Sequence, residues 1–290
     1  MTNWLIFGAG FSGLEIGRLL SAKGQRVAGT TRSIAKFSKL KEAGIEPFQF
    51  DGTAFSLELI EYLQQVTHLV MSIGPDDGGD PLLPSKAQFL AELTPNLEWI
   101  GYLSTVGVYG DHDGAWVDED TPCKPVSKRS IDRLRTEADW QAFANAKQIP
   151  LVMLRLSGIY GRGRNGLVNL ANGTAKRVIK PGQIFNRIHV DDIASAVQYL
   201  STSNISAIFN VTDSEPAPPQ DVVTFCAALM GILPPPEIPY DEANMSPMAR
   251  SFYGEVKRVS NAKLLGTGFE FTNPDYRTAF TKMWQANSWK

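Results

Sequence analysis

The 290-residue sequence has few of the residue types that build disulfide frameworks or metal sites. It contains 2 Cys and 3 His. Cys123 and Cys226 lie far apart and without metal-ligand or redox spacing, so we exclude a disulfide framework and expect a reducing environment. His68, His112 and His189 also lack the spacing of metal ligands. No metal site is predicted.

Charge of one sign and long apolar runs are also missing. Lys+Arg 28 against Asp+Glu 30 gives a formal net charge of −2, which provides no electrostatic attraction for nucleic acid or an anionic membrane. No apolar run approaches the roughly 18 residues that a membrane span requires. The first apolar run, Trp4–Phe7, lacks the basic flank of a signal peptide. We therefore expect an unprocessed cytoplasmic protein that binds a small molecule, with no nucleic-acid or membrane partner.

Short apolar runs alternate with helical patterns through the first two thirds of the chain. The runs lack clean polar alternation, as is typical of strands covered on both faces. The predicted strands are Trp4–Phe7, Arg26–Thr30, Glu46–Phe50, His68–Ile73, Trp99–Ser104, Leu151–Leu156 and Ala207–Val211. The predicted helices between them include Ser12–Ser21, Ser56–Gln65, Gln88–Leu93 and Ser127–Lys147. This order predicts βαβ units and an α/β fold, a Rossmann-type doubly wound parallel sheet.

The character of the sequence changes after Val211. Proline-rich loops flank an apolar helical pattern over Val222–Met230, which predicts a smaller C-terminal α/β lobe. We assign residues 1–165, with about 188–212, to a dinucleotide-binding domain. Residues 166–187 and 213–290 are assigned to a substrate-binding lobe.

A glycine-rich turn follows the first predicted strand. Gly8, Gly10 and Gly13 form the pattern G-x-G-x-x-G at the start of an amphipathic helix. Gly8 would permit the tight turn, Gly10 the approach of a pyrophosphate, and Gly13 close packing of helix on strand. With Phe11 and Ser12, these residues would present backbone N–H groups to the phosphates. The alternative is a turn that needs glycine only for packing.

The end of the second predicted strand bears on the cofactor. Units that bind NAD carry Asp or Glu about 20 residues beyond the glycines, to bond the ribose 2′-hydroxyl. This sequence has Thr31, Arg32 and Ser33 there, with no acid. Arg32 could pair with a 2′-phosphate, assisted by the two hydroxyls, so NADP is predicted over NAD. The alternative is a solvated arginine beside an NAD site.

Two further pairs of residues follow predicted strands, at the carboxyl ends where open α/β sheets bind ligands. Asp51 and Gly52 come after the third strand, and Ile73 and Gly74 after the fourth. All four are candidate cofactor-binding residues. Asp51 could accept a hydrogen bond from an adenine amino group, or could instead cap a turn.

Several segments together resemble the extended short-chain dehydrogenase/reductase family, that is, NAD-dependent epimerases and dehydratases. The matching segments are Gly8–Gly13, Leu103–Gly110, Leu154–Arg164 and Arg187–Ala194, with weaker support from Phe209–Pro216 and Asn261–Leu265. The resemblance covers nearly the whole chain. It also implies cofactor contacts from the residues after the sixth strand, Ser157, Gly158 and Ile159, and pairing of protomers into a homodimer through two helices.

The resemblance implies a Ser/Thr after the fifth strand and a Tyr-x-x-x-Lys pair on the next helix. Thr105 stands at the first position, but Arg129 and Arg133 stand where the tyrosine and lysine would be. Arginine does not deprotonate in proteins, so this proton relay is missing and the chain is an atypical member. Alternatively, Arg133 forms an exposed i, i+4 ion pair with Glu137. Tyr109 is a candidate substitute acid–base group, with packing as its alternative role.

Three arginines are candidate substrate-binding residues. Arg162, Arg164 and Arg187 come from segments that border the substrate cleft in the family, and guanidinium groups suit carboxylate and phosphate. Arg187 lies two residues before His189, whereas the substrate-phosphate arginine of sugar-nucleotide epimerases lies four before the histidine. We therefore expect an anionic small molecule and do not assign a nucleotide sugar.

Two functions fit these features. The first is an NADP-dependent oxidoreductase or epimerase/dehydratase-like enzyme with an atypical active site. The second is a cofactor-binding sensor or scaffold without redox chemistry. The missing Tyr and Lys favour the second, and the retained glycine pattern, Thr105 and the substrate lobe favour the first.

Overall fold

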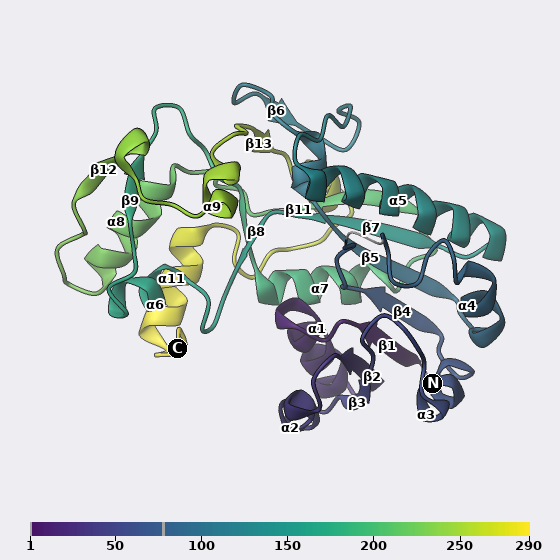
Figure 1. Cartoon of the computed structure of the whole chain (residues 1–290). Helices are drawn as coiled ribbons and strands as arrows, with labels where there is room; N and C mark the ends of the chain where they lie inside the picture. Colours follow the sequence, from purple (N-terminus) through teal and green to yellow (C-terminus); the bar gives the residue numbers. More distant parts are fainter. Residues whose placement is uncertain (1, 77–78) are drawn as a thin grey trace. The chain divides into compact units, whose positions relative to one another are not determined.

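The predicted strands meet in one sheet. The computed structural model describes residues 2–76 and 79–290. Within this part of the chain a seven-stranded sheet has the order β11-β7-β5-β4-β1-β2-β3 (Figure 1). Its strands are β1 (Asn3–Phe7), β2 (Arg26–Thr31), β3 (Glu46–Gln49), β4 (His68–Met71), β5 (Trp99–Thr105), β7 (Leu151–Leu156) and β11 (Ala207–Val211). The β1–β2, β1–β4, β2–β3 and β4–β5 pairs are parallel. The predicted Rossmann-type parallel sheet is confirmed.

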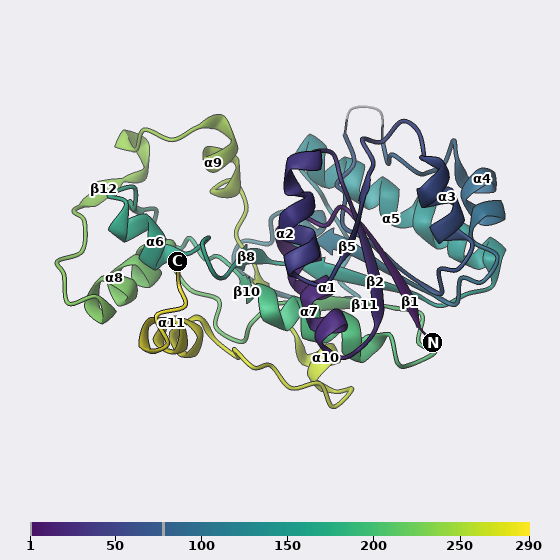
Figure 2. The same ribbon diagram turned by 90° about the horizontal axis from the view of Figure 1, so that it is seen from below.

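Helices cover both faces of this sheet. In Figure 2, α3, α4 and α5 lie on one side of the strands and α1 and α7 on the other. The helices associated with the sheet are α1 (Phe11–Ala22), α2 (Phe37–Glu42), α3 (Leu57–Leu63), α4 (Ala87–Leu93), α5 (Lys128–Lys147) and α7 (Val190–Leu200). A short 3₁₀ helix, η1 (Ile34–Lys36), precedes α2. Coverage of both faces explains why the strands read as continuous apolar runs.

Alternate strand residues pack toward opposite helix layers. Leu5 and Phe7 of β1 share a buried cluster with Trp140 of α5, whereas Ile6 lies against α1. The period of two along a strand produces this division, because successive side chains point to opposite faces. Both layers are apolar, so the sheet lies at the centre of the core.

The chain divides into two compact units. Unit 1 contains Met1–Thr105, Lys128–Arg155 and Ile193–Phe209, and it holds most of the sheet and its helices. Unit 2 contains Val106–Ser127, Leu156–Asp192 and Asn210–Lys290.

Unit 2 is built from short elements. Its strands form parallel pairs in the described residues, β8 with β10, β9 with β12 and β6 with β13. The strands are β6 (Trp116–Val117), β8 (Gly158–Tyr160), β9 (Arg177–Ile179), β10 (Arg187–His189), β12 (Glu237–Pro239) and β13 (Arg258–Val259). The helices are α6 (Gly166–Ala171), α8 (Pro219–Leu229), α9 (Pro247–Phe252), α10 (Ala262–Leu265) and α11 (Tyr276–Gln285), with 3₁₀ turns η2 (Val106–Tyr109) and η3 (Tyr240–Glu242). One apolar cluster joins side chains of α6, α8 and α11.

Two classes of feature are not found in residues 2–76 and 79–290. No helix there combines the length and apolar character needed to cross a bilayer. No three His, Cys, Asp or Glu side chains there gather into a group that could hold a metal ion.

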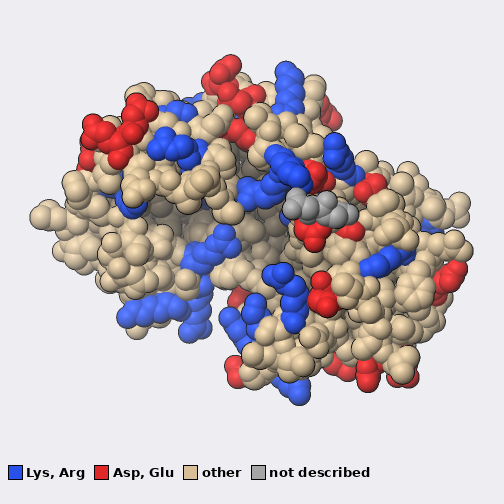
Figure 3. Space-filling model, viewed as in Figure 1, with Lys and Arg blue, Asp and Glu red and all other residues tan. Residues whose placement is uncertain are grey.

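On the face drawn in Figure 3, Lys and Arg side chains are interspersed with Asp and Glu.

A buried ion pair fixes α5 against the sheet. Glu137 of α5 accepts two hydrogen bonds from Arg155 of β7, from Nε at 3.1 Å and from Nη2 at 2.7 Å. Ser104 of β5 donates to the same carboxylate at 2.5 Å. Glu137 and Arg155 are each 4% exposed. The exposed Arg133–Glu137 pair considered from the sequence is therefore wrong: Glu137 points inward, because the buried Arg155 satisfies its charge.

Removing the arginine of this pair should destabilise the fold strongly. Arg155→Met would leave Glu137 buried without a counter-charge, and we expect a loss of about 3–5 kcal/mol in the free energy of unfolding. Urea denaturation measures it. The control is Arg26→Met, because Arg26 and Glu46 form a pair with 43% and 49% of their side chains exposed. That change should cost no more than about 1 kcal/mol. Equal losses in the two variants would contradict a special role for the buried pair.

Candidate functional site

The glycine turn of unit 1 has the conformation that its sequence predicts. Gly8 has a φ of +86°, a left-handed conformation that glycine adopts readily. Its N–H donates to Thr30 Oγ1 at 2.9 Å, and Ala9 N donates to Thr30 O at 2.8 Å. A Cβ on Gly13 would stand 2.7 Å from the carbonyl oxygen of Gly8. Gly13 therefore allows α1 to pack close to β1.

Gly10 occupies the open part of the turn. It is the N-cap of α1, and the nearest heavy atom to a Cβ built there, Gly8 O, would be 3.9 Å away. No side chain caps this helix by a hydrogen bond, and its first turn holds no acidic residue. The positive end of a 12-residue helix is thus accessible to an anion without a competing carboxylate.

The end of β2 presents one cation. Arg32 and Ser33 are exposed, directly after the last strand residue. Thr31 is buried, and its hydroxyl accepts a hydrogen bond from Ser33 N at 3.4 Å. Thr31 therefore orders the backbone here, while Arg32 and Ser33 have side chains that a ligand can reach.

Asp51 caps a turn after β3. Its Oδ1 accepts from both the backbone N–H of Thr53 at 2.9 Å and the hydroxyl of Thr53 at 2.6 Å. These hydrogen bonds, the side-chain bond first, hold the pKa of Asp51 below its usual value. Gly52 has a φ of +101°, and its carbonyl accepts from Lys86 Nζ at 2.7 Å. The capping alternative for Asp51 is thus observed, and its exposed carboxylate can still accept a further hydrogen bond.

The residues after β4 connect the glycine turn to α5. A Cβ on Gly8 would lie 2.8 Å from Ile73 Cγ1, and one on Gly74 would lie 2.9 Å from Arg133 Nη2. Arg133 Nη1 donates to Leu103 O at 2.9 Å and to the hydroxyl of Tyr102 at 3.2 Å. Arg133 is therefore brought to the same edge of the sheet as the glycine turn. Within the described residues its Nε has no hydrogen-bond partner.

The other predicted catalytic residues differ in accessibility. Thr105 ends β5 and is partly exposed, and Arg129 is exposed in the first turn of α5. Tyr109, in unit 2, is fully buried, and its hydroxyl donates to Asn210 Oδ1 at 2.7 Å. This placement favours the packing role for Tyr109.

In unit 2, Arg162 and Arg164 lie in a turn that the last two residues of the chain hold. Arg162 Nε donates to Lys290 O at 2.7 Å, and Asn165 Nδ2 donates to Trp289 O at 2.7 Å. Gly161 and Arg164 exchange two backbone hydrogen bonds of 3.0 Å across the turn. Both arginines are exposed.

The segment Ser157–Ile159 also belongs to unit 2. Ser157 is buried and its N–H donates to Val211 O at 3.3 Å. Gly158 and Ile159 begin β8, where Gly158 pairs with Arg187 in β10.

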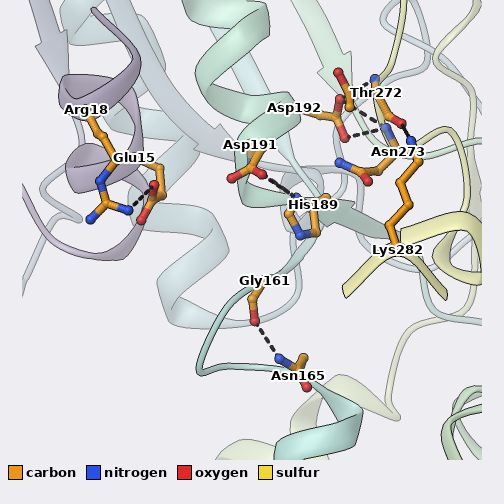
Figure 4. A network of polar contacts seen from close by, with 10 residues as sticks. All are labelled: Glu15, Arg18, Gly161, Asn165, His189, Asp191, Asp192, Thr272, Asn273 and Lys282. Atoms are coloured by element: carbon orange, nitrogen blue, oxygen red, sulfur yellow. Dashed lines mark hydrogen bonds and ion pairs between the residues drawn. The ribbon is translucent and has the colours of Figure 1, made fainter. Parts of the chain in front are cut away.

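Carboxylates at the start of α7 organise the neighbourhood of β10 (Figure 4). Asp192, 0% exposed, accepts from Thr272 N at 2.7 Å and from Asn273 N at 3.1 Å. His189 Nδ1 accepts from Asp191 N at 3.3 Å. Burial lowers the pKa of His189, although the two neighbouring aspartates oppose this shift, so its imidazole is neutral at pH 7.

Arg187 lies beside a buried carboxyl group. Its Nη1 donates to Phe185 O at 3.0 Å and to Ala217 O at 3.1 Å, and burial lowers the pKa of this guanidinium. Asp213 is 1% exposed, and its backbone N–H donates to Arg187 O at 2.7 Å. Burial raises the pKa of Asp213 to about 8, against the opposing effects of the Glu215 N–H and the Arg187 guanidinium.

Comparison with known proteins agrees with this geometry. The profile of the NAD dependent epimerase/dehydratase family matches residues 90–212, a range that does not include the glycine turn. A solved structure of a conserved protein of unknown function from Silicibacter pomeroyi DSS is 41% identical, covers 100% of both chains and has a TM-score of 0.90. The chain belongs to the NAD dependent epimerase/dehydratase family.

More distant structures share the fold of this epimerase/dehydratase family member. UDP-glucose 4-epimerase of Thermus thermophilus, solved with NAD, is 19% identical over 98% of this chain and 99% of its own, with a TM-score of 0.74. dTDP-glucose 4,6-dehydratase of Bacillus anthracis str. Ames, also in complex with NAD, is 16% identical over 98% and 96%, with a TM-score of 0.77. No curated protein sequence matches the chain.

Some site residues of this family member were not found from its sequence. Thr30, the hydrogen-bond acceptor for Gly8 N, reads only as a strand residue. Asp80, 6% exposed, accepts from Leu82 N and Leu83 N and from Trp140 Nε1 at 3.1 Å, and so fixes the segment after β4. Its signal was weak: an acid beside proline in a loop is common, and its partner Trp140 is 60 residues away.

The buried carboxyl group of Asp213 should make stability depend on pH. Its pKa of about 8 in the folded protein lies above the ordinary value of 3.8, so the folded state keeps a proton that the unfolded chain releases. This contribution to stability is therefore complete below about pH 4 and is lost as the pH rises to about 8. Asp213→Asn mimics the protonated form, and at about pH 8.5 it should exceed the wild type by roughly 1–3 kcal/mol.

Urea denaturation between about pH 5 and pH 8.5 measures this difference. Asp51→Asn is the control, because Asp51 is exposed and its pKa is lowered. Parallel stability curves for Asp213→Asn and the wild type would contradict the burial argument. The neighbouring Glu215, Asp275 and Arg187 stay unchanged in both variants, so their titration does not distinguish them.

Proposed function

We propose that the protein binds NADP(H) in unit 1 and is an oxidoreductase or epimerase/dehydratase-like enzyme that acts on a small anionic substrate. The open, uncapped N-terminus of α1 at Gly10 is the observation that carries this proposal. A pyrophosphate there would accept hydrogen bonds from backbone N–H groups and be stabilised by the helix dipole. The related epimerase and dehydratase structures with bound NAD support a nicotinamide dinucleotide as the cofactor.

The choice of NADP rests on Arg32. This exposed guanidinium follows β2, at the position where NAD-binding units place a carboxylate. A guanidinium can form a bidentate pair with a 2′-phosphate, and Ser33 adds an exposed hydroxyl. Asp51 offers its exposed carboxylate to the adenine amino group.

Arg133 replaces the lysine of the usual catalytic pair, and its role would be binding. Its guanidinium is fixed by Leu103 O and lies against Gly74, at the edge of the sheet where ligands bind. From there it can donate to ribose hydroxyls, but it cannot take up a proton near pH 7. The bound nicotinamide would supply hydride chemistry, and Thr105 would donate a hydrogen bond to a substrate oxygen. The proton donor would then be a group other than Arg129 or Arg133.

A sensor or scaffold that binds NADP without turnover is the second candidate. It is favoured by the two arginines at the Tyr and Lys positions and by the burial of the Tyr109 phenol. A cytoplasmic location and a homodimer remain predictions for both candidates.

Reversing the charge at the end of β2 should change the cofactor preference. Arg32→Asp would repel a 2′-phosphate and supply an acceptor for a ribose 2′-hydroxyl, so we expect the NADPH/NADH affinity ratio to fall at least about 100-fold. Fluorescence titration with both cofactors measures the ratio. Arg135→Asp, at a 77% exposed arginine of α5, is the control and should leave it unchanged. An unaltered ratio in Arg32→Asp would rule out the 2′-phosphate assignment.

Substitution of the two α5 arginines should distinguish the candidate functions. Arg133→Met removes the proposed ribose contact and should weaken NADPH binding about tenfold, whereas Arg129→Tyr should bind NADPH normally. Reduced-nicotinamide absorbance is then followed with aldehydes, ketones and nucleotide sugars. Turnover by the wild type with any of them supports the enzyme. Tight binding without turnover, unchanged in Arg129→Tyr, supports the sensor, and normal NADPH affinity in Arg133→Met contradicts its role in binding.

A further inference from the structure

Seven buried side-chain polar atoms of unit 2 lack a hydrogen-bond partner among the described residues; they belong to Tyr160, Arg177, Gln183, His189, Asp213, Gln220 and Tyr276. Three of the seven belong to residues that act electrostatically on Arg187. They are the hydroxyls of Tyr160 and Tyr276 and Oδ2 of Asp213. Their residues are 7%, 0% and 1% exposed. Buried polar atoms in folded proteins are nearly always hydrogen-bonded, so three unbonded ones on residues that act on a single cation need an explanation.

The three side chains lie close enough to the guanidinium of Arg187 to act on it electrostatically. Tyr160 and Tyr276 belong to one apolar cluster, and the Arg187 Cζ is 6.0 Å from the centre of the Tyr276 ring. The backbone N–H of Asp213 donates to the carbonyl oxygen of Arg187. In the β8–β10 pair, Gly158 is the partner of Arg187, and Tyr160 follows two residues later on β8. Asp213, Tyr160 and Tyr276 all act electrostatically on this guanidinium. The unbonded atoms and the cation therefore form one group.

The guanidinium of Arg187 carries the positive charge of this group. Its two hydrogen bonds from Nη1 go to neutral carbonyl oxygens, of Phe185 and Ala217, which do not neutralise the positive charge. Arg187 is the most exposed residue of the four, although its guanidinium is largely buried.

We propose that Arg187, Tyr160, Tyr276 and Asp213 form a subsite for one oxyanion group, a carboxylate or phosphoryl group, of the substrate. This inference rests on the proposed function, in which unit 2 binds a small anionic molecule. A guanidinium, two phenols and a carboxylic acid are all hydrogen-bond donors, and the missing acceptors are what an oxyanion supplies. Because burial raises the pKa of Asp213 to about 8, its carboxyl group is neutral at pH 7 and does not repel an anion.

Titration of the full-length protein with simple anions tests the subsite. At about pH 6.5, where Asp213 holds its proton, inorganic phosphate and acetate are each followed by calorimetry and by the shift in Tm. We expect one of them to bind the wild type with a Kd in the millimolar range or below, and to raise its Tm. Arg187→Gln should weaken that binding at least about tenfold and Tyr276→Phe at least about threefold. Preference for phosphate assigns a phosphoryl group, and preference for acetate a carboxylate.

Tyr240→Phe is the matched control. Tyr240 is a tyrosine of the same unit that packs against Lys180 and Arg250, outside the Arg187 group. Its variant should bind the anion as the wild type does. If Arg187→Gln does not fold, Tyr276→Phe keeps the test decisive, because it removes only an unbonded hydroxyl and should not lower the Tm in the absence of anion.

Two results would overturn the subsite. One is the absence of heat and of a Tm shift with both anions up to about 20 mM, a concentration well above a millimolar Kd. The other is an equal loss of anion binding in Tyr276→Phe and Tyr240→Phe. NADPH affinity is measured on the same samples. Normal NADPH binding without anion binding overturns the subsite alone, whereas anion binding without NADPH binding overturns the cofactor proposal alone.

Discussion

The close contact between α1 and β1 is the constraint on which the proposed dinucleotide-binding edge depends. A side chain at Gly13 would collide with the carbonyl oxygen of Gly8, and Gly8 itself requires a left-handed backbone against Ile73. The turn Gly8–Gly10 connects the end of β1 directly to the first residue of α1. The same contact leaves Gly10 open. Packing and ligand access therefore have one structural cause, the absence of Cβ atoms at three positions.

The buried Glu137–Arg155 pair fixes the second helix at this edge of the sheet, α5. It fixes the rotation of α5, and one turn earlier on that helix Arg133 then reaches Leu103 O. In a member with the usual Tyr and Lys, the same rotation would direct a proton relay to the site. Here it directs a permanent cation, which can hold an anion or a hydroxyl but cannot exchange a proton. If Arg133 stands at the lysine position, as the sequence predicts, the chemistry available there is limited to binding.

The sequence predicted the sheet well because most of its strands are apolar runs separated by helical patterns and turns. All seven predicted runs became strands of one sheet, with ends that differ by at most two residues. The short strands of unit 2, β6 and β13 among them, have two or three residues and no detectable period. The glycine turn was found because three residues close in sequence make it, whereas Tyr160, Arg187, Asp213 and Tyr276 meet only through the tertiary fold. The inward orientation of Glu137 was missed for the same reason, since its partner lies on another strand.

The energetic cost of the Arg187 group bears on the choice between the two candidate functions. Each unbonded buried polar atom costs about 1–3 kcal/mol, while a whole domain is stable by only about 5–15 kcal/mol. A protein that only sensed a dinucleotide in unit 1 would gain stability if Tyr160 and Tyr276 were phenylalanine. Polar groups that weaken a fold are typical of binding sites, where a ligand satisfies them. Such a cost in unit 2 is expected if a second molecule binds there, and a second molecule in addition to a nicotinamide dinucleotide is what an enzyme requires.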